Sequence, residues 1–223
     1  MERQVDLMEI SDGKLYGLND MVKACANNCD GCSACCHGRG DTITLDPLDV
    51  HHLKTGLQTG FEQLMTGGIS LGVVNGIIRP SMMMTEEEDS KCIFLNAQGR
   101  CGIHSFRPGL CRLFPLGRVY EEDGIKYILL TGECVRENRT KVKVRKWIDM
   151  PDMDAYEKFL IEWHDFLKEI EAAVTDAKDD TFAKNLNMYV LRKFYVENFG
   201  ETEEQFYLVF AQRLLEARKI IFG

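Results

Sequence analysis

The sequence contains no apolar run that approaches the roughly 20 residues needed to cross a bilayer. Its first residues, MERQVDLMEISDG, lack the basic-then-apolar order of a signal peptide. An excess of positive charge is also missing, because 27 Lys and Arg face 35 Asp and Glu and the formal net charge is −8. Non-specific attraction to phosphate backbones needs clustered Lys and Arg. We therefore expect a cytoplasmic protein that binds neither membrane nor nucleic acid.

Familiar catalytic patterns are missing as well. No phosphate-binding loop, Ser-His-Asp order or paired-carboxylate site stands out in the sequence. A Rossmann-type methyltransferase is not supported, because no glycine-rich loop follows an apolar strand near an acidic partner. The residues assign no catalytic side chain, and whether the protein is an enzyme stays open.

Cysteine, in contrast, is abundant and confined to one part of the chain. Nine cysteines are present, and none follows Cys134. In a reducing compartment, thiols persist for metal binding or catalysis more readily than as structural disulfides. A chain of 223 residues that is 45% hydrophobic can bury a core without such links. The cysteines therefore indicate a metal site rather than a structural framework.

The densest group of cysteines is the segment CDGCSACC, residues 29–36. Cys29, Cys32 and Cys35 follow CxxCxxC spacing, by which one loop turns several sulfurs towards one centre. Cubane iron–sulfur clusters often take three cysteines from such a run and a fourth from afar, whereas zinc sites usually combine two separate knuckles. The spacing favours iron–sulfur over zinc. Cys36, directly after Cys35, should point elsewhere, towards another metal or another iron.

A later stretch, CGIHSFRPGLCRLFP at residues 101–115, adds two thiols and two guanidinium groups. Four thiolates around zinc or an oxidised cubane leave a net charge of about −2, which nearby guanidinium groups offset. We therefore predict that Arg107 and Arg112 lie beside the bound cofactor. His37 and His104 stand close to cysteines in the sequence, but sulfur ligands are plentiful and we expect neither histidine to bind metal.

Four motifs together carry a family resemblance: CxxCxxCC at 29–36, CIFL at 92–95, CGIH at 101–104 and RPGLCRLFP at 107–115. This set resembles the bacterial YkgJ-type cysteine-cluster family of zinc- or iron-chelating domains, over about half of the chain. The resemblance implies metal binding but no known reaction. It implies the following cysteines as metal ligands: Cys29, Cys32, Cys35, Cys36, Cys92, Cys101 and Cys111, together with Cys134.

The sequence therefore predicts a metal-binding protein that holds a 4Fe-4S cluster and has a redox role. A zinc-held structural or adaptor domain is one alternative. Another is protein methyl transfer, because flagellin lysine methylases look similar in their cysteine cluster, although they are longer and nothing else here resembles them. The expected binding partner is a protein of unknown identity or a redox partner.

The remaining pattern predicts an α+β fold with an irregular cysteine-rich region of short β-hairpins, residues 1–150, and a C-terminal helical unit, residues 151–223. The hairpins are expected around Asn75-Gly76, the NAQG sequence at 96–99 and Asp123-Gly124. From about residue 152, apolar residues recur at three- and four-residue steps in three stripes, which is typical of amphipathic helices.

Short helices are expected in the N-terminal part. The spacing of Leu18, Met21, Val22 and Cys25 predicts one over residues 15–25. The pair Asp46-Pro47 predicts the start of a second helix, and Thr59 with Glu62 predicts a capping box for a third.

Overall fold

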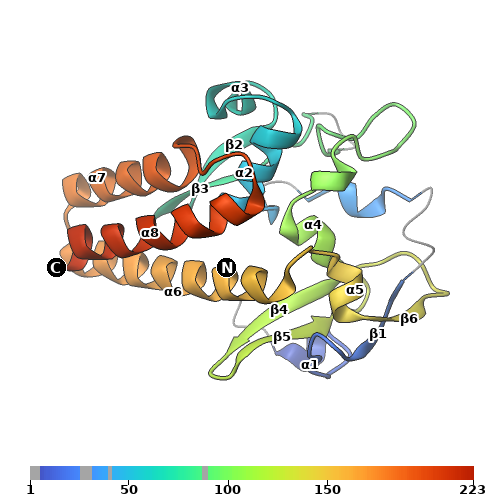
Figure 1. Ribbon diagram of the computed structural model, residues 1–223. Helices are drawn as coiled ribbons and strands as arrows, with labels where there is room; N and C mark the ends of the chain where they lie inside the picture. The colour runs from blue at the N-terminus through green and yellow to red at the C-terminus, as the bar shows by residue number, and fades with distance from the viewer. Residues whose placement is uncertain (1–5, 26–31, 40–41, 87–89) are drawn as a thin grey trace. The chain divides into compact units, whose positions relative to one another are not determined.

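The structure is a computed structural model that describes residues 6–25, 32–39, 42–86 and 90–223 (Figure 1). Its elements confirm the predicted α+β class. Contacts divide the chain into two compact units, each built from separate stretches of sequence. Unit 1 comprises 1–40, 84–104 and 108–161, and unit 2 comprises 41–83, 105–107 and 162–223. The predicted domain boundary at residue 150 stays a prediction.

Unit 1 holds the cysteines and combines short helices with two antiparallel strand pairs, β4–β5 and β1–β6. Its elements are α1 (Leu7–Ile10), β1 (Met21–Cys25), η2 (Ala34–Cys36), α4 (Gly109–Leu113), β4 (Leu116–Glu121), β5 (Gly124–Leu129), β6 (Thr140–Lys143), α5 (Val144–Ile148) and the first part of α6 (Met153–Ala177). The 3₁₀ turn η4 (His104–Phe106) begins at His104, the last residue of the 84–104 stretch of unit 1.

The β4–β5 hairpin is the predicted one, but its turn is formed by Glu122 and Asp123, one residue earlier than expected, because Gly124 already belongs to β5. Its strands pair in register from Leu116 opposite Leu129 to Glu121 opposite Gly124. Gly124 has a φ of 121°, which favours glycine over residues that carry a side chain. The local turn chemistry therefore fixed this element.

The predicted helix over residues 15–25 is wrong. Tyr16 exchanges both of its backbone hydrogen bonds with Tyr127 of β5 (2.8 Å each), and residues 21–25 form β1. In β1, Val22 and Ala24 are buried while Met21 and Lys23 are exposed, which is the alternation of a strand. Pairing with distant strands outweighed the weak helical spacing.

The hairpin predicted around residues 96–99 is reduced to a tight turn. Leu95 and Cys101 form an isolated antiparallel bridge, and neither flanking segment forms a named strand. Asn96 organises the turn, because its side-chain oxygen accepts hydrogen bonds from the backbone N–H groups of Gln98 (3.0 Å) and Arg100 (2.9 Å).

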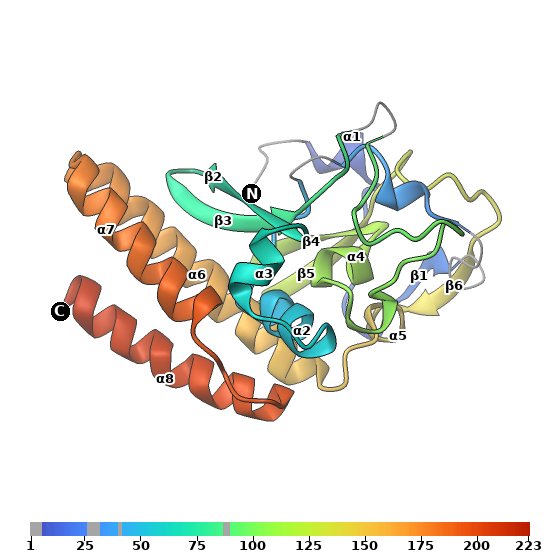
Figure 2. The same ribbon diagram turned by 90° about the horizontal axis from the view of Figure 1, so that it is seen from above.

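Unit 2 contains a β-hairpin, two short helices and the long C-terminal helices. Its elements are α2 (Pro47–Gly56), α3 (Phe61–Met65), β2 (Ile69–Val74), β3 (Ile77–Met82), the remainder of α6, α7 (Asp180–Leu191), the π-helical turn η5 (Arg192–Val196) and α8 (Glu203–Phe222). Figures 1 and 2 both show α6, α7 and α8 running alongside one another. The three predicted C-terminal helical stripes are therefore confirmed.

Of the two helix starts predicted in unit 2, the start of α2 is confirmed and the capping box predicted for α3 is not. Asp46 caps α2 as expected and forms a capping box with Asp49. The predicted capping box of Thr59 and Glu62 is wrong, because α3 begins after Gly60, whose position has no side-chain cap. A glycine tolerates this position at little cost, so the helix starts one residue later than the sequence pattern indicated.

Aromatic side chains form the core of unit 2. The ring centroid of Trp163 lies 5.1 Å from that of Phe194, 5.8 Å from that of Phe166 and 6.1 Å from that of Phe210. All four residues are buried. Packing of this kind gives large apolar burial together with favourable ring geometry, so the aromatic residues of the C-terminal stripes are core residues.

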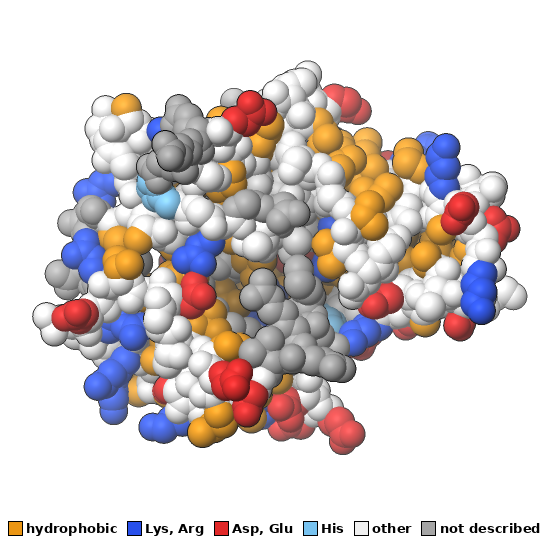
Figure 3. Space-filling model, turned by 180° about the vertical axis from the view of Figure 1, so that it is seen from behind, with side chains coloured by type: hydrophobic (Ala, Val, Ile, Leu, Met, Phe, Trp, Pro, Cys, Tyr) orange, Lys and Arg blue, Asp and Glu red, His pale blue; other side chains and the backbone are white. Residues whose placement is uncertain are grey.

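The surface mixes charged and apolar side chains. On the face shown in Figure 3, hydrophobic side chains reach the surface in several patches between charged groups. Within the described ranges, no helix combines the length and apolar character that a bilayer crossing requires.

Candidate metal centre

Backbone pairing brings together cysteines that lie far apart in the sequence of unit 1. The N–H of Cys92 donates a hydrogen bond to the carbonyl oxygen of Cys36 (2.8 Å). The backbone of Cys92 also forms an isolated antiparallel β-bridge with Met84, and the backbone of Cys101 forms one with Leu95. These short contacts place three distant segments next to one another: the end of the CxxCxxCC run, the segment at Cys92 and the segment at Cys101.

The turn at residues 96–100 also lies against the cysteine run. Gly99 has a φ of 68°, and a Cβ atom at this position would stand 3.8 Å from the hydroxyl oxygen of Ser33. The backbone N–H of Gly102 donates to the carbonyl oxygen of Phe94 (2.8 Å), which closes the loop between Cys92 and Cys101. The turn thus packs beside the residues that separate Cys32 from Cys35.

Four thiols interact with one another at this place. A hydrogen bond with the Cys35 thiol raises the pKa of Cys36 well above its usual value, and burial raises it further. The sulfurs of Cys92 and Cys101 act in the same direction. Burial likewise raises the pKa of Cys92, while a hydrogen bond from the backbone of Phe94 opposes the rise. Thiolates this close repel one another, so a cation is the partner that would stabilise them together.

A small cavity adjoins this group of thiols. It has a volume of about 20 Å³, and Cys32, Cys35 and Cys134 line it. The side chains of Phe114 and Pro115 form part of its apolar wall. Cys35 belongs both to this cavity and to the group of interacting thiols, so it connects the two.

Arg39 supplies positive charge beside the cavity, and the sequence patterns did not single it out. Its guanidinium donates to the carboxylate of Glu133 (2.7 Å) and lies 5.0 Å from the ring centroid of Phe114. Glu133 and Phe114 both line the cavity. Arg39 follows the cysteine run closely, but Glu133 and Phe114 lie far along the chain, so only the folded structure reveals this position.

The other predicted site residues are placed as follows. Arg112 is buried in α4, and its guanidinium donates to the carbonyl oxygen of Asp149 (3.1 Å). Arg107 belongs to unit 2. Cys111 lies in α4 between Leu110 and Arg112. Cys29 falls outside the described residues. The roles proposed for these four residues stay predictions.

The donor chemistry of the site fits a soft metal. No disulfide joins any two of the eight cysteines in the described part of the chain, and all eight are partly buried. Thiolate sulfur is the preferred ligand of zinc and of iron–sulfur clusters. As the side chains stand, no group of three or more His, Cys, Asp or Glu among the described residues could hold a metal ion. Ligation therefore requires the thiols to lose their protons and turn towards a common centre.

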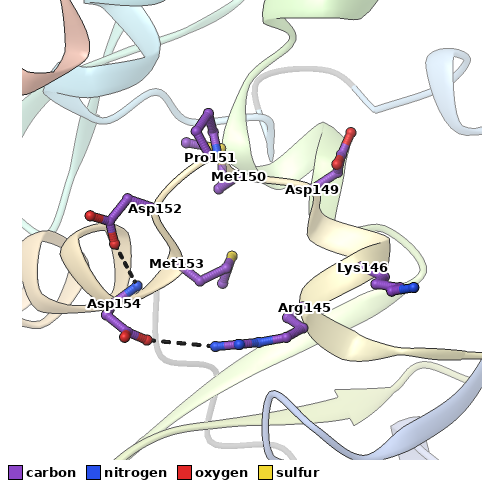
Figure 4. A pocket seen from close by; sticks show the side chains of 8 residues that line it. All are labelled: Arg145, Lys146, Asp149, Met150, Pro151, Asp152, Met153 and Asp154. Atoms are coloured by element: carbon purple, nitrogen blue, oxygen red, sulfur yellow. Dashed lines mark hydrogen bonds and ion pairs between the residues drawn. The ribbon is translucent and has the colours of Figure 1, made fainter.

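A separate hollow lies at the connection between α5 and α6 (Figure 4). It has a volume of about 420 Å³ and is lined by both charge signs, including Arg145 and Asp154, whose side chains pair at 3.6 Å. No cysteine lines it. Because no thiol reaches this hollow, it is separate from the sulfur site.

The fold and the site define an α+β protein whose irregular N-terminal part gathers cysteine side chains for metal binding. The model of the family "CxxCxxCC: Putative zinc- or iron-chelating domain" matches residues 28–140. The chain belongs to this family, which confirms the resemblance found in the sequence and supports metal binding. Searches of curated proteins and of solved structures give no match.

Proposed function

We propose that the protein holds an iron–sulfur cluster of the 4Fe-4S type and uses it as a redox centre. Cys29, Cys32 and Cys35 supply three ligands, and a distal cysteine supplies the fourth. A single observation carries the proposal: more sulfur gathers here than one tetrahedral zinc ion takes. The described thiols at the interacting group and the cavity are Cys32, Cys35, Cys36, Cys92, Cys101 and Cys134.

The surroundings suit a centre with negative charge. Four thiolates leave an oxidised cubane with a net charge of about −2, which a nearby cation offsets. Arg39 stands beside the cavity and its contact with Phe114 holds the guanidinium there. The backbone hydrogen bond at Cys92 is of the kind that tunes cluster potentials. In this role the protein works in the reducing cytoplasm and exchanges electrons with a redox partner protein.

A zinc site is the second candidate, and the size of the cavity favours it. A volume of about 20 Å³ is close to that of one water molecule or one ion. Cys32, Cys35 and Cys134 would supply three of the four ligands of a tetrahedral site. Zinc would then stabilise the fold without redox chemistry.

Metal analysis of protein purified without oxygen separates the two candidates. We expect iron and acid-labile sulfide in equal amounts, with a visible absorption band that dithionite bleaches. Cys35→Ser should lose most of this iron, whereas Ser33→Ala, a change in the same loop that removes no sulfur, should retain it. Stoichiometric zinc with no sulfide would overturn the iron–sulfur proposal and establish the zinc site.

A further inference from the structure

Helix α8 has two apolar faces, and only one of them is used within the protein. One face is buried in unit 2 and carries Phe206, Phe210, Leu214 and Ala217. Four other large apolar side chains of α8 are exposed: Leu208 (68%), Leu215 (62%), Ile220 (67%) and Phe222 (46%). Leu208, Leu215 and Phe222 recur every seven residues, which is close to two helical turns, so these three form one line on the side of α8 opposite the buried face.

Charged residues lie on the same line of α8. Glu204 precedes Leu208 by four residues, and Lys219 follows Leu215 by four residues. At about 100° per residue, both lie within roughly 40° of the line. Both side chains are exposed, and neither forms an ion pair with another residue in the described ranges. Figure 2 shows α8 at the edge of the group formed by α6, α7 and α8.

The part of the line between Glu204 and Lys219 is complementary to itself when one copy is reversed, and Phe222 lies beyond this part. A twofold axis placed between Ala211 and Gln212 sets Leu208 opposite Leu215 of a second copy. The same axis sets Glu204 opposite Lys219 of that copy, so each contact occurs twice with opposite charges paired. In a twofold-symmetric dimer the same patch of both copies meets, so the patch must be complementary to a reversed copy of itself. The short Ala211 side chain at the centre lets the two helices approach closely.

We propose that this face of α8 binds a second copy of the chain in an antiparallel helix pair. The apolar residues supply the favourable burial, and the paired charges set the antiparallel direction. An unrelated partner would need no such symmetry within α8. The inference does not depend on which metal unit 1 binds, because every residue that carries it belongs to unit 2.

Sedimentation equilibrium of the full metal-loaded chain tests the proposal. We expect a concentration-dependent dimer. Leu208→Asp with Leu215→Asp should abolish it, and the milder pair Leu208→Ser with Leu215→Ser should weaken it at least tenfold. Ile220→Asp is the matched control, because Ile220 is equally exposed (67%) on the same helix but points about 140° away from the line. It should leave the dimer intact.

Charge exchange tests the direction of pairing. Glu204→Lys and Lys219→Glu should each weaken the dimer, by about tenfold at low salt, since each puts like charges together. The two changes combined should restore the dissociation constant to within about threefold, because opposite charges again face one another. A monomer at all concentrations, a dimer that survives both leucine pairs, or a double exchange as weak as the single ones would overturn the proposal.

Discussion

The backbone N–H of Cys92 donates a hydrogen bond to the carbonyl oxygen of Cys36 (2.8 Å). This bond joins two cysteine-bearing segments through their main chains, so their relative placement does not depend on the sulfur atoms. The fold can therefore present the thiols to a metal, and the loss of one sulfur can be separated from the loss of the scaffold.

We predict that Cys92→Ser weakens metal binding by about 100-fold or more while the fold is retained. Loss of a group that only hydrogen-bonds to a ligand already weakens metal sites by about 10- to 100-fold, so loss of a ligand should cost at least as much. Competition with a chelator and circular dichroism measure the two effects. Ser90→Ala is the control. The backbone carbonyl oxygen of Ser90 accepts a hydrogen bond from the N–H of Gly38 (2.7 Å), and this substitution keeps that backbone bond. Unchanged metal affinity in Cys92→Ser would exclude Cys92 as a ligand.

Arg39 should tune the charge of the bound centre. Arg39→Gln removes a positive charge beside the cavity, which makes the addition of an electron less favourable. We expect a lower midpoint potential, measured by a redox titration monitored by electron paramagnetic resonance. Arg192→Gln, which removes an exposed arginine of unit 2, should leave the potential unchanged. An equal shift in both variants would show that net charge alone is responsible.

Asn187 should hold the β2–β3 turn to α7. Its side-chain oxygen accepts from the N–H of Ile78 (2.7 Å), and its side-chain nitrogen donates to the carbonyl oxygen of Gly76 (2.9 Å). Asn187→Ala leaves both backbone groups without this partner, and we expect the free energy of unfolding to fall by about 2–4 kcal/mol.

The exposed Asn185 on the same helix provides the control for this prediction. Asn185→Ala should change stability by less than about 0.5 kcal/mol. Urea denaturation of both variants measures the difference. Equal stabilities would mean that water replaces the Asn187 side chain without loss.

His51 should make unit 2 sensitive to acid. Burial between aromatic rings, those of Phe199 and Phe206 among them, lowers the pKa of His51 to about 4, and the nearby His52 and Lys54 act in the same direction. Between pH 6.5 and 4 the unfolded chain therefore binds a proton at His51 that the folded chain does not. Stability contributed by the neutral side chain is complete above pH 6.5 and decreases as the pH falls through this window, by up to about 3 kcal/mol.

Urea denaturation at pH 7 and at pH 4.5 tests this dependence. The wild-type protein should lose more stability between these conditions than His51→Gln, which has no titrating group at this position. The difference between the two losses isolates the histidine from the carboxylates that titrate in both proteins. Identical losses would contradict the assigned role of His51.

Local patterns in the sequence predicted the elements that depend on nearby residues. The turn at Asn75-Gly76 forms where expected, and the second predicted hairpin forms with its turn one residue earlier, at Glu122-Asp123. Gly76 and Gly124 both have positive φ, which favours glycine. The capping box at Asp46 is also local, since donor and acceptor are three residues apart. The segment 15–25 failed because Tyr16 and Val22 pair with strands more than 100 residues away, and such pairing leaves no trace in the spacing of neighbouring residues.

By itself, the sequence determined that this is an α+β, cysteine-rich protein of a metal-binding family, because residue type and spacing set turn geometry, helical stripes and the supply of sulfur. Only the tertiary structure decided which thiols meet. The neighbourhood of Cys36, Cys92 and Cys101, and the position of Arg39 beside Glu133, arise from contacts between distant segments. Those contacts depend on how the whole chain packs, which no local spacing encodes.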